Sequence, residues 1–171
     1  MKKLINALAL ALMTGPIAQA TDAEVTASRQ ASARFADINV AKAEGYTQLF
    51  ECTVNPKAPS KGTMGVHFIN GDFASDGELD ISKPEVLMYE PQPDGSMQLV
   101  ALEYVVFENK WNGAETPTFM GQEMKRKTAV GTHPVDPFYE VHVWHWRHNP
   151  DGIFADWNRQ VSCAHDTTAQ Q

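Results

Sequence analysis

Apolar residues repeat at helical spacing in the first part of the chain and at alternating positions in the rest. The segment from Asp22 to Glu44 is rich in alanine and contains neither Gly nor Pro. Its apolar residues recur every three or four positions, as in Ala27, Ala31, Phe35 and Ile38. This spacing predicts one helix with a break near Asp37. Gly45 stands where a glycine C-cap is expected to end it.

Downstream of Gly45, short segments rich in aromatic and β-branched residues are separated by clusters of Pro, Gly, Asn and Asp. This pattern is typical of a meandering antiparallel sheet. We predict strands over residues 46–54, 64–70, 85–90, 97–107 and 138–146. The Pro and Asp-Gly content of residues 91–96 favours a hairpin between the third and fourth of them. The predicted fold class is α+β, with an N-terminal helix packed on a curved antiparallel sheet or small β-barrel.

Residues 108–137 interrupt this pattern. The segment is rich in Gly and Pro and shows little periodicity. We therefore predict a long ordered excursion over the mouth of the sheet, without strands of its own.

Residues 1–20 have the three parts of a secretory signal peptide. Lys2 and Lys3 form the charged start, residues 4–13 form an apolar run, and residues 18–20 (Ala-Gln-Ala) form a small-residue cleavage site. The apolar run is shorter than the roughly 20 residues that span a bilayer, and no later segment approaches that length. We predict one domain over residues 21–171 that is periplasmic or secreted and has no membrane anchor after signal cleavage.

The charge of the chain argues against a nucleic-acid partner. The formal net charge is −7, and loss of Lys2 and Lys3 with the signal peptide makes it more negative. The remaining basic residues are scattered apart from one run at residues 125–127, so no basic face is expected to neutralise phosphates. A small-molecule ligand is the partner class that remains, and the oligomeric state is left open.

The two cysteines, Cys52 and Cys163, lie near the two ends of the predicted sheet region. In an oxidising compartment a disulfide between them is expected. A metal-ligand role for one of them is the alternative.

Glu103 is the most informative ionisable residue, because it interrupts an apolar strand. Alternation along residues 99–107 puts Glu103 on one face with Leu99, Ala101 and Val105, and the opposite face is apolar as well. A carboxylate in such a strand is costly unless it has a partner or a ligand. A shifted pKa or a bound metal would each satisfy it.

His67 and His142 occupy comparable positions in two other predicted strands. Together with Glu103 they are the residue types of a two-histidine, one-carboxylate site for a divalent transition metal such as zinc, copper or iron. Glu90 is a candidate fourth ligand or general base, and Glu103 and Glu90 are the candidate catalytic residues. Two alternatives remain: core histidines hydrogen-bonded to the backbone or to Glu103, and a metal-free acid/base pair. Whether the protein is an enzyme stays open.

A second hypothesis is a non-catalytic binding protein for an apolar or aromatic ligand. Trp144, Trp146 and Tyr104 are its candidate pocket residues, although aromatic residues on strands belong to the core more often than to a site. A third is a structural module with a filled core. The sequence has no Gly-rich phosphate loop, nucleophile elbow, paired Cys motif or Ca²⁺ loop.

Five motifs stand out along the chain: MGVHF at residues 64–68, PEVLMYEP at 84–91, HVWHWRHNP at 142–150, FADWN at 154–158 and VSC at 161–163. On these motifs the chain resembles a family of small exported bacterial proteins of unassigned function. The resemblance covers nearly the whole of residues 21–171 and implies one exported domain, but it implies no reaction.

Overall fold

The N-terminal part of the protein is helical. The structure is a computed structural model that describes residues 17–167, so residues 1–16 of the expected signal peptide lie outside the described residues. Helix α1 (Ile17–Ser32) continues through a 3-10 turn, η1 (Ala33–Ala36), into the short helix α2 (Ile38–Ala43). Asp37 separates them, and its carboxylate accepts the Asn39 amide hydrogen at 2.9 Å as an N-cap of α2. The predicted break near Asp37 is confirmed.

The rest of the chain forms a seven-stranded antiparallel sheet in the order β1-β3-β4-β5-β9-β8, with β2 also paired to β3. A small hairpin of β6 and β7 lies outside this sheet. The strands are β1 (Tyr46–Gln48), β2 (Thr53–Val54), β3 (Thr63–Asn70), β4 (Val86–Pro91), β5 (Met97–Phe107), β6 (Thr118–Phe119), β7 (Gln122–Glu123), β8 (Lys125–Val130) and β9 (His133–Val143). A 3-10 turn, η2 (Pro59–Lys61), lies between β2 and β3, and helix α3 (Gly71–Asp76) directly follows β3.

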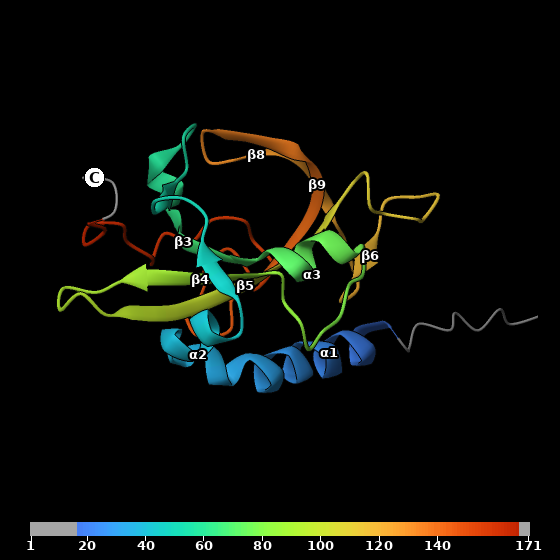
Figure 1. The fold of residues 1–171 in the computed structure, drawn as a ribbon, viewed down its shortest axis with the longest axis horizontal. Coiled ribbons are helices and arrows are strands. Elements are labelled where there is room, and N and C mark those ends of the chain that lie inside the picture. Colours follow the sequence, from blue (N-terminus) through green and yellow to red (C-terminus); the bar gives the residue numbers. More distant parts are fainter. Residues whose placement is uncertain (1–16, 168–171) are drawn as a thin grey trace, which may run out of the picture.

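The helices α1 and α2 cover one face of the sheet (Figure 1). Phe35 from η1 packs edge-on against Tyr46 of β1, with ring centroids 5.1 Å apart, and its carbonyl accepts the Tyr89 hydroxyl at 2.7 Å. The main core lies between these helices and the outer face of the sheet. Its fully or nearly fully buried members include Phe35, Ala41, Tyr46, Val66, Leu87, Tyr89, Leu102, Tyr104 and Val143.

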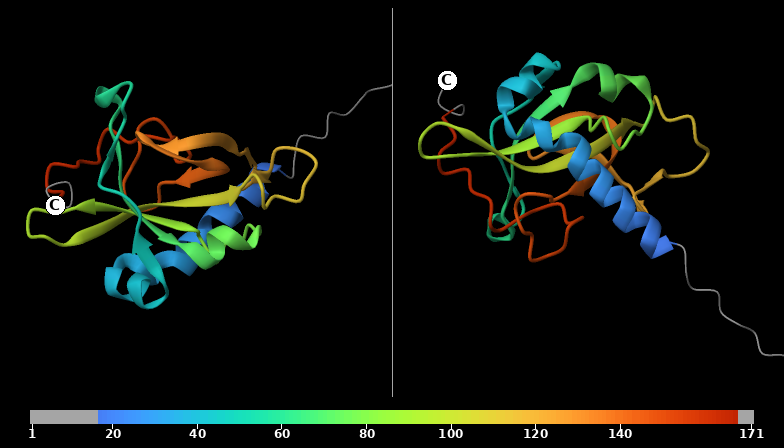
Figure 2. Two further views of the ribbon diagram at one scale, coloured as in Figure 1. Left: turned by 45° about the horizontal axis from the view of Figure 1, so that its top comes forward. Right: turned by 90° about the horizontal axis from the view of Figure 1, so that it is seen from below.

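The other face of the sheet is concave, because β9 and β8 curve over it to form a half-barrel (Figures 1 and 2). The turn between β8 and β9 reaches the segment between β1 and β2. There the His133 ring stacks on Phe50 with centroids 4.2 Å apart, and its Nε2 lies 2.8 Å from a Glu51 carboxylate oxygen. The predicted α+β fold with a curved antiparallel sheet is confirmed.

The prediction that residues 108–137 contain no strands was wrong. The segment holds β6, β7, β8 and the start of β9. Strand β8 is a sheet edge of mostly polar residues with its side chains exposed or half-buried. Such an edge strand carries little of the apolar alternation by which strands are recognised in a sequence.

The expected alternation along β5 also fails at one point. Met88 of β4 pairs with Ala101 and Tyr89 pairs with Leu99, so Val100 is an extra residue in the ladder. This β-bulge moves Leu99 to the outer core, whereas Ala101 stays on the inner face. Glu103 and Leu99 therefore do not share a face.

A disulfide joins Cys52 to Cys163, as predicted. It connects the segment before β2 to the C-terminal part of the chain, 111 residues away. The Cys52 amide also donates a hydrogen bond to Asp166 at 2.7 Å. Between residues 17 and 167 there is no helix with both the length and the apolar character that crossing a membrane requires.

Replacing both cysteines, Cys52→Ser with Cys163→Ser, should lower the free energy of unfolding by about 2 to 5 kcal/mol, because the disulfide closes a long loop in the unfolded chain. Urea denaturation of the variant and the oxidised protein measures this. Hydrogen exchange should rise first around Trp144, which packs against the C-terminal segment through Val161. Equal exchange at Trp144 in both proteins would count against this coupling.

Glu85 should make stability depend on pH. Its buried carboxyl accepts the Val105 amide hydrogen at 2.9 Å, and burial raises its pKa from 4.5 to about 8 despite that bond. The folded protein therefore holds a proton that the unfolded chain releases between these two values. The contribution of Glu85 to the free energy of unfolding should fall by up to about 1.4 kcal/mol per pH unit from pH 4.5 to 8 and then level off. Denaturation over this range should show a decline for Glu85→Gln that is shallower by this amount than the decline of the unmodified protein.

Candidate metal centre

The inner face of the half-barrel carries a polar cluster between two apolar ones. On the side of α3, Ala74, Val86, Val105 and Phe138 form one apolar cluster. On the opposite side, Met64, Met88, Ala101, Trp144 and Val161 form the other. Between them lie His67, Glu103, Glu140 and His142, residues that are all at most 3% exposed. The polar groups are therefore enclosed by apolar residues on both sides.

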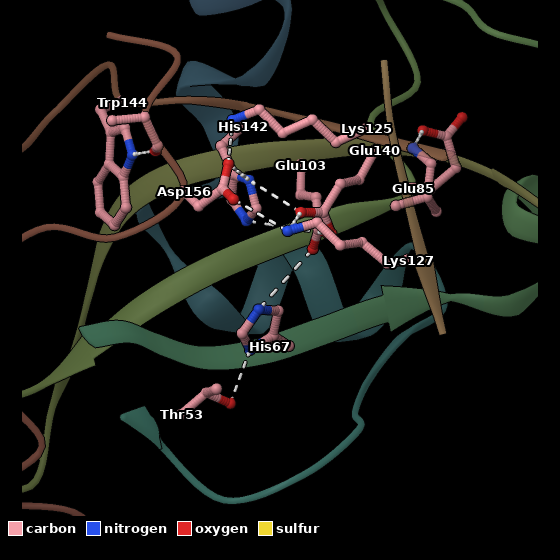
Figure 3. Close-up of polar contacts among 12 residues, drawn as sticks. Thr53, His67, Glu85, Glu103, Lys125, Lys127, Glu140, His142, Trp144 and Asp156 are labelled. Atoms are coloured by element: carbon pink, nitrogen blue, oxygen red, sulfur yellow. Dashed lines mark hydrogen bonds and ion pairs between the residues drawn. The ribbon is translucent and has the colours of Figure 1, made fainter. Parts of the chain in front are cut away.

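Three of the predicted residues converge in this cluster (Figure 3). Glu103 of β5 and His142 of β9 are direct cross-strand partners, and His67 projects from β3 on the far side of β4. His67 Nε2 lies 3.8 Å from one Glu103 oxygen, and His142 Nε2 lies 3.9 Å from the other. One ligand atom from each residue lies within 4.8 Å of the other two. The three side chains could hold a metal ion.

These separations exceed hydrogen-bond length and are close to the spacing of metal ligands. Two ligand atoms bound at about 2.1 Å in a tetrahedral site are about 3.4 Å apart. The Nε2-to-carboxylate distances of 3.8 and 3.9 Å would have to shorten only slightly to reach that spacing. Small side-chain rotations would achieve this, since Glu103 and His142 already stand directly opposite each other on β5 and β9.

The ring nitrogens of His142 are the least satisfied polar atoms of the cluster. Both are buried, and neither has a hydrogen-bond partner among the residues that the structure describes. A neutral imidazole has one donor and one acceptor nitrogen, and leaving either buried group unpaired costs about 1 to 3 kcal/mol. His142 Nδ1 faces Glu140 at 3.7 Å and Asp156 at 3.9 Å, whereas Nε2 faces Glu103. An ion at Nε2, with Nδ1–H directed to a carboxylate, would satisfy both nitrogens.

His67 has the same arrangement. Its Nε2 faces Glu103, and its Nδ1 lies 3.5 Å from the Thr53 hydroxyl of β2. Both histidines thus direct Nε2 to the centre and Nδ1 to an oxygen outside it. In metal-binding histidines, a contact of the second ring nitrogen with such an oxygen usually fixes the orientation of the ring.

Burial determines the protonation of the three central groups. It lowers the pKa of His67 to about 3, with a smaller contribution from His142. It also lowers the pKa of His142, against the opposing effect of Glu140 and Asp156. Burial and then the Glu140 carboxylate raise the pKa of Glu103 well above its usual range. Both imidazoles are therefore neutral near pH 7, which is the form that binds metals.

A second group of potential ligands, Glu140, His142 and Asp156, shares His142 with the first. Its carboxylates already have cationic partners. Lys127 Nζ lies 3.0 Å from Glu140 and 2.9 Å from Asp156, and Lys125 also pairs with Asp156. Burial by itself would raise the pKa of Asp156, but His142 and the two ammonium groups outweigh it and lower the pKa to about 2. The first group is therefore the better candidate for a metal.

Asp156 reaches the cluster from the C-terminal segment, which side-chain hydrogen bonds hold in place. Trp144 donates from Nε1 to the Ala155 carbonyl at 2.6 Å, and Asn149 donates to the Trp157 carbonyl at 3.0 Å. Asn158 pairs with Thr63 of β3 through two backbone hydrogen bonds. These contacts fix the loop that carries Asp156.

Sequence reasoning missed Glu140, Asp156 and Lys127. A usable signal existed for the first, because Glu140 lies two residues before His142 and so faces the same side of β9. Lys125 and Lys127 are also two residues apart on one strand, so their side chains point to the same side of β8, and both pair with Asp156. Asp156 lies in a loop, and no local pattern pointed to it.

Glu90 does not join the centre, contrary to the prediction of a fourth ligand or general base. One of its oxygens accepts the Ser162 amide hydrogen at 2.9 Å, and the other pairs with Arg147. Glu90 instead ties the C-terminal segment to β4. Its carboxylate is fully engaged by these two partners.

The predicted aromatic pocket is not assembled. Trp144 belongs to the inner apolar cluster, whereas Tyr104 belongs to the outer core and donates its hydroxyl hydrogen to the Ile81 carbonyl at 2.7 Å. Trp146 also packs on the outer core. Strand β9 ends at Val143, so the alternation that grouped Trp144 with Trp146 stops before these residues. Trp144 is therefore separated by the sheet from Tyr104 and Trp146.

Comparison of the chain with protein-family models, characterised proteins and solved structures finds no match.

Lys127→Met should lower the free energy of unfolding by about 1.5 to 3 kcal/mol, because it leaves the Glu140 and Asp156 carboxylates without their shared ammonium group. Chemical denaturation near pH 7 measures the loss. Arg126→Met on the same strand is the matched control, because Arg126 pairs with Glu108 at the exposed surface. An equal loss in both variants would contradict a special role for the buried ammonium.

Proposed function

We propose that this is an exported protein that binds one divalent transition metal ion through His67, Glu103 and His142. Two imidazoles and one carboxylate suit zinc, copper and iron alike, so the donor set defines the class of ion rather than one element. Three protein ligands leave at least one coordination position for water or for a small molecule.

The observation that carries this proposal is the orientation of the two buried histidines. Each directs Nε2 to the Glu103 carboxylate at a distance too long for a hydrogen bond, and both His142 nitrogens lack a hydrogen-bond partner in the described part of the chain. A filled core would favour direct hydrogen bonds between these groups. An ion between them would satisfy the ring nitrogens and Glu103 together.

The surroundings support the same conclusion. Thr53, Glu140 and Asp156 lie where outer partners of the two ligand histidines are needed. A metal-free acid/base pair of Glu103 with a histidine would require a direct contact between them. The distances of 3.8 and 3.9 Å favour a bridging ion over that alternative.

Export is the second part of the proposal. The Cys52–Cys163 disulfide suggests an oxidising compartment, such as the periplasm or the extracellular medium. The signal-peptide pattern of residues 1–20 and the family resemblance support the same location. We infer a small-molecule ligand rather than a nucleic acid as the partner, in keeping with the acidic composition.

Protein purified without an affinity tag should contain about one transition metal ion per chain by elemental analysis. In calorimetric titrations of the metal-free protein with Zn²⁺, His67→Ala and His142→Ala should each weaken binding by at least about a hundredfold. Asp156→Asn should weaken it about tenfold, as expected for an outer partner of a ligand histidine.

Two further variants separate ligand loss from misfolding. Glu103→Gln keeps the size of the side chain but cannot lose a proton to become a carboxylate ligand, so it should lose Zn²⁺ affinity while retaining a cooperative unfolding transition. His148→Ala, at an exposed position, should bind Zn²⁺ like the unmodified protein. Absence of stoichiometric metal, together with unchanged Zn²⁺ affinity in His67→Ala, would overturn the proposal.

A further inference from the structure

A cavity of about 620 Å³ opens beside the candidate metal centre. His67, Glu103 and Glu140 line its inner end, residues 55–58 with Lys61 form one wall, and β8 forms another. Its volume lies within the range of small-molecule binding sites, roughly 300 to 1,000 Å³. The metal centre therefore borders, through His67 and Glu103, a space of a size that suits a small molecule.

The charge of this cavity is opposite in sign to that of the protein. The chain carries a net charge of −7, yet the cavity lining contains four basic residues and only two acidic ones. The acidic residues are Glu103 and Glu140, and Lys127 already neutralises Glu140. A bound divalent ion would add further positive charge.

Two of the basic residues, Lys57 and Lys61, stand exposed at the rim. Neither ammonium group forms an ion pair within residues 17–167. Arg126, on the opposite wall, is held by Glu108. The rim lysines are therefore the groups that can receive an anion.

The loop that carries the rim lysines has a fixed conformation. The buried Asn55 side chain accepts the Lys57 and Ala58 amide hydrogens at 3.0 and 2.9 Å. Gly62 ends the loop with φ of 104°, and a Cβ at this position would lie 2.2 Å from the Asn158 carbonyl oxygen. A fixed loop reduces the entropy lost when a ligand binds.

A smaller apolar pocket of about 90 Å³ lies on the other side of Glu103. Eight of its nine lining residues are apolar, and it shares Glu103 and Val130 with the larger cavity. A ligand beside the metal centre would thus meet positive charge in one direction and apolar side chains in the other.

We propose that the cavity binds a small organic anion, with its oxyanion group at Lys57 and Lys61 and a short apolar group directed toward the pocket at Val130. The inference rests on the proposed metal function for the position of the ligand beside the ion. A carboxylate and a phosphate would each provide the oxyanion.

The test is an NMR titration of the Zn²⁺-loaded protein with four probes of equal chain length: butyrate, butyl phosphate, butanol and butylamine. Butyrate or butyl phosphate should bind and shift the amide signals of Lys57 and Lys61, and the tighter of the two identifies the oxyanion. Butanol and butylamine should bind at least about threefold more weakly. Equal binding of all four probes would overturn the proposal.

The double variant Lys57→Gln with Lys61→Gln should weaken binding of the preferred anion by about 3- to 10-fold and leave Zn²⁺ affinity unchanged. Lys42→Gln with Lys110→Gln removes the same charge at exposed positions outside the cavity lining and should leave anion affinity unchanged. Equal effects of the two double variants would overturn the proposal, since only the overall charge would then matter.

The outcomes separate this inference from the proposed function. Protein that takes up Zn²⁺ but binds neither anion would overturn the anion site and leave the metal function standing. Protein that takes up no Zn²⁺ but binds an anion dependent on Lys57 and Lys61 would overturn the metal function and retain the lysine contact.

Discussion

The burial of Glu103 between two imidazoles is the constraint on which the rest of the structure depends. A carboxyl group inside a protein needs a partner, and the register of β5 and β9 places His142 directly opposite it. His67 reaches the same point only because the sheet is strongly curved. The helices α1 and α2 cover the outer face with a conventional apolar core, which leaves the concave face free to hold polar groups.

The two groups of potential ligands differ in how their charge is balanced. Glu140 and Asp156 are neutralised by lysines of β8, so they are stable without any further cation. Glu103, His67 and His142 form no ion pair with a lysine or arginine between residues 17 and 167, and burial keeps them neutral. Glu140 and Asp156 thus have their charge balanced within the protein, whereas Glu103 and the two histidines retain the capacity to bind an ion. The flanking apolar clusters reinforce this difference, because they limit the access of water.

The C-terminal segment links the candidate site to the disulfide. It carries Asp156, returns along β3 through Asn158, and is bonded to β4 through Glu90 before it reaches Cys163. The Asp156 carboxylate, which faces His142 Nδ1, is therefore held by a part of the chain that has no regular secondary structure. Its position depends on a few hydrogen bonds and one covalent cross-link, which connects the geometry of the site to the oxidation state of the cysteines.

The sequence by itself determined the features that local chemistry dictates. The helix break at Asp37, the pairing of the two cysteines and the unusual placement of His67, Glu103 and His142 in apolar strands all follow from neighbouring residues or from composition. Only the tertiary structure decided that Glu90 pairs with Arg147 and that a bulge at Val100 turns the Leu99 side chain to the outer face of the sheet. It also decided that Lys127 and Asp156 complete the cluster. These outcomes depend on the curvature of the sheet and on the path of the C-terminal segment. Both are determined by contacts between residues far apart in the chain, and such contacts leave no periodic pattern in the sequence.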